Sequence, residues 1–578
     1  MRRIAIVGAG QSGAQLALGL LGHGYQVTLV SERSADQLRT GPVLSSQCMF
    51  ETAQQAEREL GLSLWDEHCP PVGAVSFTLA GDGGSRVSPE PRLRWRAALD
   101  APAQSVDQRL KISTWLTLFA ENGGQLVHTT ASVADVEQLG ADHDLVIIAA
   151  GTGGIGRLFR RDDSRSPFRK PQRSLALTYV TGMRPSPDGA DLSFSTVPGI
   201  GEYFSFPALT ASGPCDIMCF EGIPGGPMDY WDSVTTPEEH LAESQWILER
   251  FFPWEAERCA GVRLTDPGGM LRGRVTPTVR HPVGVLPSGA RVLGLGDVVV
   301  LNDPVTGQGA NTAAKAASFY LDAIVAHGDG DFDDDWMTAT FERYWRGWAK
   351  WVTEWTNAFL APAPPHVLDL LGAAARLPGL ASVLANGFDD PKTFFPWWFD
   401  ATETRRLVAT HAAASEAPFD RRELRRALGQ YATGVTVVTC RGSDGAPVGM
   451  TANSFTSVSL DPPLVLWCPS KTASSTPVFQ EASHFTVNVL SSGQHDLSRQ
   501  FATTDSEKFT GVETREGLGG APVLEGSVAT FECRTEAVHD AGDHLIMVGE
   551  VERFDAPGGA PLVFHSGFYH LATRHPDV

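Results

Sequence analysis

The chain has 578 residues, of which 42% are hydrophobic and 20% charged, enough to build at least two cores. Because 67 acidic residues outnumber 46 basic ones, the formal charge of -21 disfavours nucleic acid and anionic lipid surfaces as partners. Eight scattered cysteines without CxxC or zinc spacing predict free thiols in a reducing cytoplasm and no bound metal, and no apolar stretch is long enough to cross a bilayer.

The chain opens with a strand, a glycine-rich turn and a helix. Ile4–Val7 is a β-branched run, and a G-x-G-x-x-G pattern follows it at Gly8, Gly10 and Gly13. The first glycine permits a tight turn, the second lets a pyrophosphate approach the backbone, and the third lets the helix pack closely on the strand. A second strand at Val27–Val30 completes a β-α-β unit, so the pattern predicts a dinucleotide site rather than a structural turn.

Further residues of this unit are expected to bind the same cofactor. The first turn of the helix offers unpaired N–H groups to an anion. An acidic residue about twenty positions past the motif suits the hydroxyls of the adenosine ribose. The candidates are Gln11, Ser12, Glu32 and Arg33.

Later segments predict a buried parallel sheet, a second sheet and a helical region. Leu145–Ile148 and Val292–Leu293 are short apolar runs that end at glycines, as in parallel sheets covered on both faces. The Pro- and Gly-rich stretch from about 172 to 285 predicts a substrate-facing sheet, and residues 330–400 predict helices. Four tryptophans spaced three or four residues apart should share a helix face, packed in a core or lining a pocket. They are Trp345, Trp348, Trp351 and Trp355.

A second glycine cluster favours FAD over NAD. Gly294–Asp297, Asp303-Pro304 and Gly307–Thr312, which opens an alanine-rich helix, resemble the ribitol-binding motif of FAD-dependent aromatic hydroxylases. The resemblance implies that Asp297 binds a ribitol hydroxyl or the pyrophosphate region, and that the helix points its positive end at the flavin. A glycine loop before a surface helix is the alternative. The residues assigned to FAD here are Gly151, Asp297, Pro304, Gly307, Gly309, Ala310 and Asn311.

One expected motif is missing from the N-terminal half. Hydroxylases of this type that reduce their own flavin carry an Asp-Gly pair after the strand equivalent to Leu145–Ile148. Here the strand is followed by Ala149–Gly154, which contains no such pair. This half is therefore expected to need an external source of reduced flavin.

Residues 1 to about 400 resemble the FAD-dependent styrene monooxygenases. The resemblance implies that Arg109 lies near the flavin, and a surface ion pair is the alternative. Pro42–Ser46 departs from the family, which has an Arg and an Asn near the flavin at this place. The matching pieces are Val106–Leu110, Lys170–Arg173, Gly294–Asp297, Asp303–Asn311 and Trp355–Asn357.

The sequence pattern of the C-terminal part differs from that of the first 400 residues. An alanine-rich polar stretch predicts a first domain over residues 1–410, a linker over 411–417 and a second domain over 418–578. Short strands with turn signals then favour a small β-barrel; they are Val435–Cys440, Pro463–Cys468, Phe485–Leu490 and Ile546–Val551. This half resembles the short-chain flavin reductases of two-component monooxygenases, which are split β-barrels that dimerise. The matching pieces are Tyr431–Val435, Gly449–Ser457, Asp461–Leu464 and Gly542–His544.

The resemblance to reductases implies a flavin site and a nicotinamide site. His544 would position the nicotinamide of NADH, because hydride passes directly to the flavin. Small and polar side chains at a strand edge would bind FAD, or FMN, although serines in loops are also common turn formers. The candidates are Thr451, Ala452, Asn453, Ser454, Cys468, Ser470, Ser474, Ser475, Lys508, Gly542 and Asp543.

The expected fold class is α/β plus β, with a Rossmann-like FAD domain of the aromatic hydroxylase type, a substrate sheet and helices, then a split β-barrel. The two resemblances imply a self-sufficient monooxygenase. NADH would reduce FAD on the C-terminal half, and the N-terminal half would use O2 to form a C4a-hydroperoxide that epoxidises styrene-like alkenes, or oxidises indole or aryl sulfides. Oxygen transfer to an alkene requires no catalytic acid or base, and no convincing His or carboxylate constellation stands out in the N-terminal half.

Two alternatives remain open at this point. A weak oxygenase half would leave an NADH oxidase that releases hydrogen peroxide, and a protein without turnover would be a flavin-binding redox sensor. The Gly542–His544 motif argues against the sensor, whereas the altered Pro42–Ser46 loop is compatible with the oxidase. A cytoplasmic homodimer, joined through the reductase half, is expected.

Overall fold

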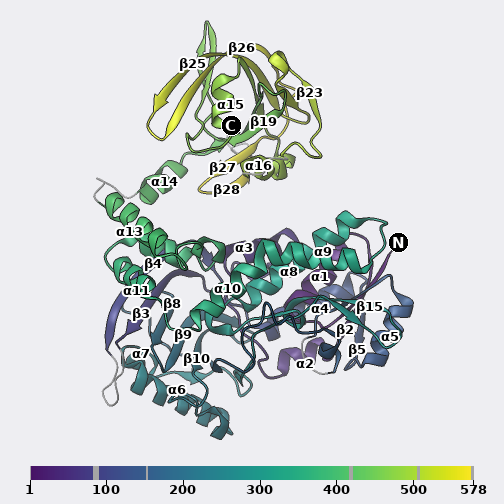
Figure 1. Cartoon of the computed structure of the whole chain (residues 1–578), viewed down its shortest axis with the longest axis vertical. Helices are drawn as coiled ribbons and strands as arrows, with labels where there is room; N and C mark the ends of the chain where they lie inside the picture. The colour runs from purple at the N-terminus through teal and green to yellow at the C-terminus, as the bar shows by residue number, and fades with distance from the viewer. Residues whose placement is uncertain (1, 82–89, 151–153, 416–420, 504–507, 574–578) are drawn as a thin grey trace. The chain divides into compact units, whose positions relative to one another are not determined.

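The chain folds into two compact units, Met1–Glu416 and Ala417–Val578 (Figure 1). The computed structural model describes residues 2–81, 90–150, 154–415, 421–503 and 508–573. Helix α13 (Ala401–Ser415) extends through most of the segment that the sequence predicted as a linker.

A six-stranded sheet forms one part of the N-terminal unit, with the order β14-β15-β6-β1-β2-β5. Every neighbouring pair is parallel except β14–β15. The apolar residues of β1, β2, β6 and β15 are buried, as predicted for strands covered on both faces, whereas β5 is not buried. The strands are β1 (Arg3–Val7), β2 (Gln26–Ser31), β5 (Gln125–His128), β6 (Leu145–Ile148), β14 (Val283–Val285) and β15 (Arg291–Gly294). Helices α1 (Gln11–Gly22), α4 (Gln108–Glu121), α5 (Val133–Asp142) and α8 (Gly309–His327) belong to the same part.

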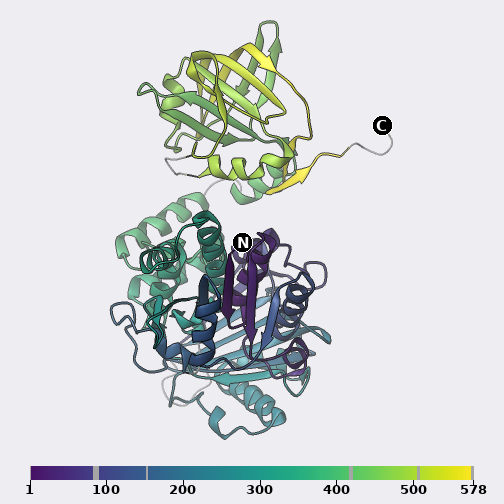
Figure 2. The ribbon, with the colours of Figure 1, turned by 90° about the vertical axis from the view of Figure 1, so that its right-hand side faces the viewer.

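A second, larger sheet has the order β11-β7-β10-β9-β8-β3-β4, and β12 also pairs with β7. Figure 2 shows most of its strands in blue to teal, and the first strands of the parallel sheet in purple. The sheet predicted between 172 and 285 is confirmed, but β3 (Val72–Ala80) and β4 (Pro91–Ala103) also belong to it. Its other strands are β7 (Ser174–Thr181), β8 (Leu192–Val197), β9 (Gly201–Thr210), β10 (Gly213–Gly222), β11 (Arg263–Leu264) and β12 (Met270–Gly273).

Helices cover both faces of this second sheet. Along β9, Phe204 and Phe206 join a cluster with helices α10 (Lys350–Phe359), α11 (Pro365–Ala374) and α12 (Pro378–Asn386). Tyr203, which points the other way, joins a cluster with α6 (Pro237–Phe251) and α7 (Pro253–Cys259). Shorter elements of this unit are α2 (Ala35–Thr40), α3 (Glu51–Glu59), β13 (Thr278–Val279) and β16 (Val300–Leu301).

The tryptophan stripe is divided between two cores. A π-helical turn, Trp345–Ala349, lies between α9 (Asp334–Tyr344) and α10. Trp345 and Trp348 pack with the parallel sheet, whereas Trp355 belongs to the aromatic cluster beside the second sheet. The predicted packing in a core is confirmed for these three tryptophans, whereas Trp351 is half-buried.

The C-terminal unit is built on a seven-stranded antiparallel sheet with the order β19-β18-β22-β25-β26-β21-β20. Its core contains Trp467, Phe479 and Phe485. The strands are β18 (Thr436–Arg441), β19 (Pro447–Ala452), β20 (Thr456–Leu460), β21 (Pro463–Trp467), β22 (His484–Val489), β25 (Ala529–Ala541) and β26 (His544–Asp555). Smaller sheets contain β17 (Thr433–Gly434), β27 (Leu562–His565) and β28 (Phe568–Leu571), and β23 (Thr514–Glu516) and β24 (Pro522–Leu524). Its helices are α14 (Arg421–Gly429), α15 (Thr476–Glu481) and α16 (His495–Ala502).

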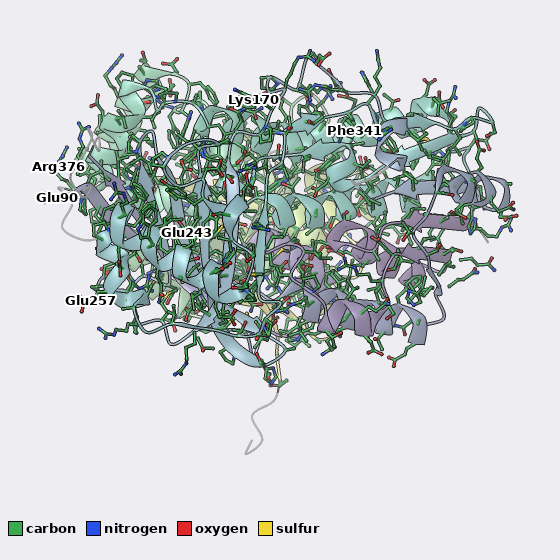
Figure 3. All side chains as sticks on the ribbon, turned by 90° about the horizontal axis from the view of Figure 1, so that it is seen from below. Glu90, Lys170, Glu243, Glu257, Phe341 and Arg376 are labelled. Carbon is green, nitrogen blue, oxygen red and sulfur yellow. The ribbon has the colours of Figure 1, made fainter. Side chains whose placement is uncertain are left out.

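The described surface carries charged side chains, and the cysteines form no disulfides. Charged side chains such as Glu257 and Arg376 project from the ribbon (Figure 3), and all eight cysteines are free. Within the described ranges, no group of three or more His, Cys, Asp or Glu side chains could hold a metal ion. No single described helix is long and apolar enough to cross a membrane; α11 and α12 meet such a test only as a pair bent by 117°.

Candidate active site

The glycine-rich turn after β1 has the geometry that its sequence predicts. Gly8 has a φ of +114°, and a Cβ there would lie 2.6 Å from the Ala150 nitrogen. A Cβ on Gly13 would lie 1.9 Å from the Gly8 oxygen, so only glycine lets helix α1 approach the strand this closely. A Cβ on Gly10 would meet no protein atom within 4 Å. The first and third glycines therefore serve packing, and the second borders open space.

The first turn of α1 is available to an anion. Gly10 is the N-cap and has no side chain to accept from the first N–H groups. The side chain of Gln11 turns inward and donates to Glu57 at 2.8 Å, so only its backbone is available. Ser12 is buried next to Gly296, where a Cβ would lie 2.6 Å from the serine hydroxyl. The second glycine cluster thus packs directly on this turn.

Glu32 and Arg33, which the sequence predicted as ribose-binding residues, lie at the carboxyl end of β2. They directly follow β2, whose partner β1 leads into the glycine turn, so both segments leave the same edge of the sheet. Glu32 is exposed and accepts from the Thr130 hydroxyl at 3.4 Å. Its carboxylate therefore remains accessible to a ligand.

The Asp297 carboxyl group lies at the surface, next to protein atoms that partly desolvate it. Its side chain is exposed, yet surrounding protein desolvates the carboxyl and raises its pKa to about 6. Helix α8 begins nearby, after Gly307 in the left-handed region, and its N-cap residue Gln308 makes no side-chain cap. Gln308 Oε1 and Thr312 Oγ1 are buried without a hydrogen-bond partner in the described part of the chain. The start of α8 therefore offers unsatisfied hydrogen-bonding groups to a ligand.

Other predicted residues of this segment differ in their surroundings. The buried Asn311 side chain accepts from Phe50 N–H at 2.9 Å and donates to the Cys48 carbonyl at 2.9 Å, so it fixes the segment before α3. Pro304 and Ala310 are half-buried, and Gly307 and Gly309 are exposed. Gly151 lies outside the described residues.

Arg109 is neither free nor on the surface. Its guanidinium pairs with Asp107 at 2.7 Å and with Asp266 at 2.9 Å, and it also donates to the Gly41 carbonyl. Its side chain is 10% exposed. This clamp joins α4 to the loop before residues 42–46 and to the segment after β11.

A group of buried charges was missed at the sequence level. Glu202, Glu221 and Asp303 are 5%, 1% and 2% exposed, and Arg173 beside them is 8% exposed. The expectation that this half contains no carboxylate constellation is wrong. The available signal was one glutamate in each of two largely apolar strands, which the β9–β10 register places opposite each other.

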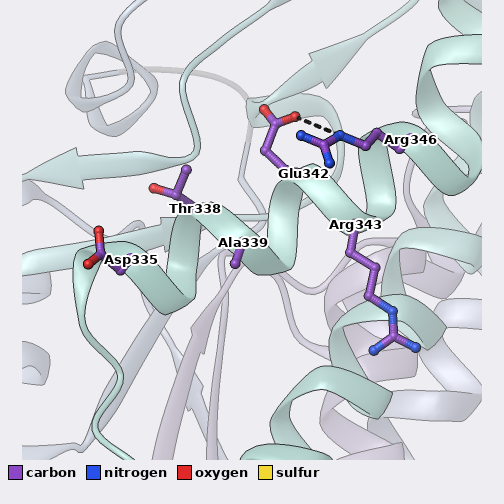
Figure 4. Close-up of a pocket in the computed structure, with 6 residues that line it drawn as sticks. All are labelled: Asp335, Thr338, Ala339, Glu342, Arg343 and Arg346. Carbon is purple, nitrogen blue, oxygen red and sulfur yellow. Dashed lines mark ion pairs between the residues drawn. The ribbon is translucent and has the colours of Figure 1, made fainter.

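One surface hollow lies apart from these residues. Figure 4 shows that its lining comes from α9 and the π-helical turn, with Glu342 and Arg346 paired at 3.8 Å. Because a single continuous helical segment cannot enclose a ligand, this hollow does not qualify as the active site. Its lining residues are Asp335, Thr338, Ala339, Glu342, Arg343 and Arg346.

In the C-terminal unit, the Gly542–His544 turn lies against the loop after β21. The backbone of His544 forms an antiparallel β-bridge with Ser470, and the Lys471 N–H donates to the Asp543 carbonyl at 3.0 Å. Gly542 has a φ of +72°. The His544 side chain is 45% exposed, and its Nδ1 lies 2.8 Å from the Asp543 carboxylate. The ring is thus oriented by its neighbour and open to solvent.

Some of the predicted flavin residues of this unit form hydrogen bonds within the protein, and others are exposed or half-buried. Ser454 Oγ accepts from Cys468 N–H at 2.9 Å, and Thr451 donates to the Ser498 carbonyl at 2.6 Å. Lys508 donates to the carbonyls of Gly449 and Phe501 rather than standing free for a phosphate. Asn453 and Ser474 are exposed, and Ala452, Ser470 and Ser475 are half-buried.

Comparison with known proteins assigns each unit. The family described as "Flavin reductase like domain" matches residues 428–572. FMN reductase (NADH) SmoA of Agrobacterium fabrum is 51% identical over 153 residues, 26% of this chain and 87% of that protein. The C-terminal unit belongs to the flavin reductase family. The solved styrene monooxygenase flavin reductase of Pseudomonas putida S12 is 30% identical over 26% of this chain and 99% of its own, with a TM-score of 0.25.

The N-terminal unit has a different relative. The family described as "Styrene monooxygenase A putative substrate binding domain" matches residues 151–258. Styrene monooxygenase StyA of Pseudomonas fluorescens is 29% identical over 402 residues, 68% of this chain and 94% of that protein. The chain is therefore an oxidoreductase that joins a styrene monooxygenase-like region to a flavin reductase in one polypeptide.

Proposed function

We propose that this chain is a self-sufficient monooxygenase, in which the C-terminal unit reduces FAD with NADH and the N-terminal unit uses reduced FAD and O2 to epoxidise styrene-like alkenes. The observation that carries the proposal is the fusion itself, because one polypeptide contains a monooxygenase-like region and a flavin reductase. Bound flavin supplies the oxygen chemistry, and the protein supplies binding, orientation and exclusion of water.

The parallel sheet would be a Rossmann-like FAD domain of the aromatic hydroxylase type. The open side of Gly10 and the uncapped start of α1 would hold the pyrophosphate, and Glu32, with Arg33 beside it, the adenosine ribose. Asp297 would bind the ribitol, with the first turn of α8 facing the flavin. The unpartnered oxygens of Gln308 and Thr312 support a ligand at this place.

An aromatic cluster supports an apolar, ring-containing substrate such as styrene, indole or an aryl sulfide. Trp355 stacks on Phe394 with ring centroids 4.4 Å apart, and Phe388 meets Trp355 edge-on at 5.2 Å. A hydrogen bond of 2.7 Å between the Thr306 and Thr356 hydroxyls connects this cluster to the segment before α8. The substrate would therefore bind between that segment and the second sheet.

The C-terminal sheet would be a split β-barrel that binds FAD, or FMN, at the strand edge formed by Thr451–Ser454. Exposed apolar side chains such as Leu460 at 93% and Leu571 at 72% support a homodimer through this unit. The eight free thiols support a reducing, cytoplasmic location.

The test mixes the purified chain with NADH, catalytic FAD, air and styrene, without added reductase, and compares styrene oxide formed with NADH consumed. Substantial epoxide is the expected result. Consumption of NADH with hydrogen peroxide as the only product would assign the chain to NADH oxidases, or would require another substrate. Absence of NADH consumption would contradict the reductase assignment.

His544→Ala should slow NADH oxidation by about 10²-fold, because a misplaced nicotinamide cannot reach the flavin for hydride transfer. FAD binding by the N-terminal unit should be unchanged. His539→Ala, at an exposed histidine of the same β25–β26 hairpin, is the matched control and should retain normal turnover. Steady-state NADH absorbance measures both, and unchanged turnover of His544→Ala would remove this residue from its assigned role.

A further inference from the structure

Two of the buried carboxylates lack a cation of their own. Arg173 forms a bidentate pair with Glu202, with nitrogen–oxygen distances of 2.7 and 2.9 Å. A fork of this kind neutralises the Glu202 carboxylate. Glu221 and Asp303 lie beside this pair and are also buried. Their two carboxyl groups therefore have neither a cation of their own nor contact with solvent.

Glu221 and Asp303 each have one oxygen without a donor. Glu221 Oε2 and Asp303 Oδ2 are buried and have no hydrogen-bond partner among the described residues when both groups are ionised. The two side chains lie within hydrogen-bond reach of each other. Two ionised carboxylates at this separation repel each other, whereas a single proton between them satisfies both oxygens.

Burial assigns that proton to Glu221. Desolvation and the neighbouring Asp303 carboxylate raise the pKa of Glu221 well above its usual range, and desolvation raises the pKa of Asp303 to about 6. Arg173 opposes both shifts, Glu202 adds to them, and the Cys219 thiol is the other titratable group facing Glu221. Both causes favour the protonated form of Glu221 beside the Asp303 carboxylate.

The pair is fixed at the start of the segment assigned to the flavin. Asp303 Oδ1 accepts from Val305 N–H at 3.2 Å and so caps the 3-10 turn that leads to Gly307 and α8. On the other side, a Cβ on Gly201 would lie 2.3 Å from the backbone carbonyl oxygen of Glu221, so the β9 and β10 backbones are tightly apposed here. The two carboxyl groups thus connect the second sheet to the loop before α8.

We propose that Glu221 and Asp303 share a buried proton and supply it to the oxygenation step, a role that rests on the proposed function. The balance of that step requires a proton: the reduced FAD anion, O2, the alkene and one proton give oxidised FAD, the epoxide and water. Two electrons pass from the flavin to O2, one oxygen atom enters the substrate, and the other leaves as water. Between turnovers the pair takes up one proton again, which requires transient access of water because the surrounding protein encloses both carboxyl groups.

The shared proton can be read without turnover. At about pH 8, where exposed carboxyls are ionised, the infrared spectrum of the full chain should retain the C=O stretch of a protonated carboxylic acid. Glu221→Gln should abolish this band while its amide N–H still donates to Asp303. Asp303→Asn should abolish it as well, because the Glu221 oxygen then accepts from the new amide. Glu243→Gln, at a helix α6 glutamate outside the pair, should leave it intact (Figure 3).

Proton supply is tested by the rate of epoxide formation in a single turnover of the full chain, loaded with chemically reduced FAD and styrene. Glu221→Gln should form epoxide about 10²-fold more slowly than the wild type, with flavin reoxidation diverted to hydrogen peroxide. The wild-type rate should fall as pH rises through the titration of the pair, and the variant should lose this dependence. Glu243→Gln should behave as the wild type.

Each outcome separates the steps of the inference. A wild-type spectrum without the band, at any pH above the range of exposed carboxyls, overturns the shared proton and needs no variant. If Glu221→Gln loses the infrared band but forms epoxide at the wild-type rate, the pair does not supply the proton of the oxygenation step. Wild-type protein that shows the band but forms no epoxide overturns the proposed function and the supply role, and supports the shared proton alone.

Discussion

Gly13→Ala should destabilise the N-terminal unit by about 3 kcal/mol, the upper end of the usual cost of overpacking. The new Cβ would lie 1.9 Å from the Gly8 oxygen and 3.2 Å from Ala149 Cβ. Since one of these atoms belongs to the backbone, no rotamer change relieves the contact, and α1 has to move away from β1. Urea unfolding of the full chain measures the loss, and flavin reduction by the separate C-terminal unit should survive as an internal control.

Gly10→Ala is the matched variant, because a Cβ there meets no protein atom within 4 Å. Its φ of -78° suits alanine, so the stability cost should stay below about 1 kcal/mol. If the pyrophosphate approaches this glycine, FAD should bind at least about tenfold more weakly, a loss of 1.4 kcal/mol or more. Fluorescence titration measures this. Unchanged FAD affinity would place the pyrophosphate elsewhere.

The predictable part of this fold is the part with local signals. The strands β1, β2, β6 and β15 are buried on both faces, so each is a short apolar run that ends at a glycine or a turn. Strand β4 was missed although Arg92, Arg94 and Arg96 alternate with apolar residues, the period of a half-buried strand. An arginine-rich segment resembles a loop until its pairing with β3 is known.

The buried charges could not be predicted from spacing. Arg173, Glu202, Glu221 and Asp303 come from distant parts of the chain, and only the register of β9 with β10 and the position of the loop before α8 bring them together. Arg109 shows the same limit. Its place in a family-like motif indicated importance, but its partner Asp266 lies 157 residues away, so the sequence could not distinguish a flavin contact from a clamp.

Arg109→Met should destabilise the N-terminal unit by about 3–5 kcal/mol, because it leaves the Asp107 carboxylate, 1% exposed, without its cation. Arg109→Lys should recover only part of this, since an ammonium cannot bridge Asp107 and Asp266 as a fork does. The Asp266 carboxyl has a pKa lowered mainly by its hydrogen bond from Arg109. A lowered pKa stabilises the fold above the unfolded value, so the difference from wild type should shrink as pH falls below about 4.

Arg39→Met is the control for this prediction, because Arg39 is an exposed arginine of α2 whose change should stay within about 0.5 kcal/mol. Urea unfolding at several pH values and FAD titration of the same proteins distinguish the two roles of Arg109. A clamp predicts a large loss of stability, with FAD affinity falling only as the unit unfolds. Wild-type stability together with weakened FAD binding would instead mean that Arg109 contacts the flavin, and that the Asp107 and Asp266 carboxylates release it when the cofactor binds.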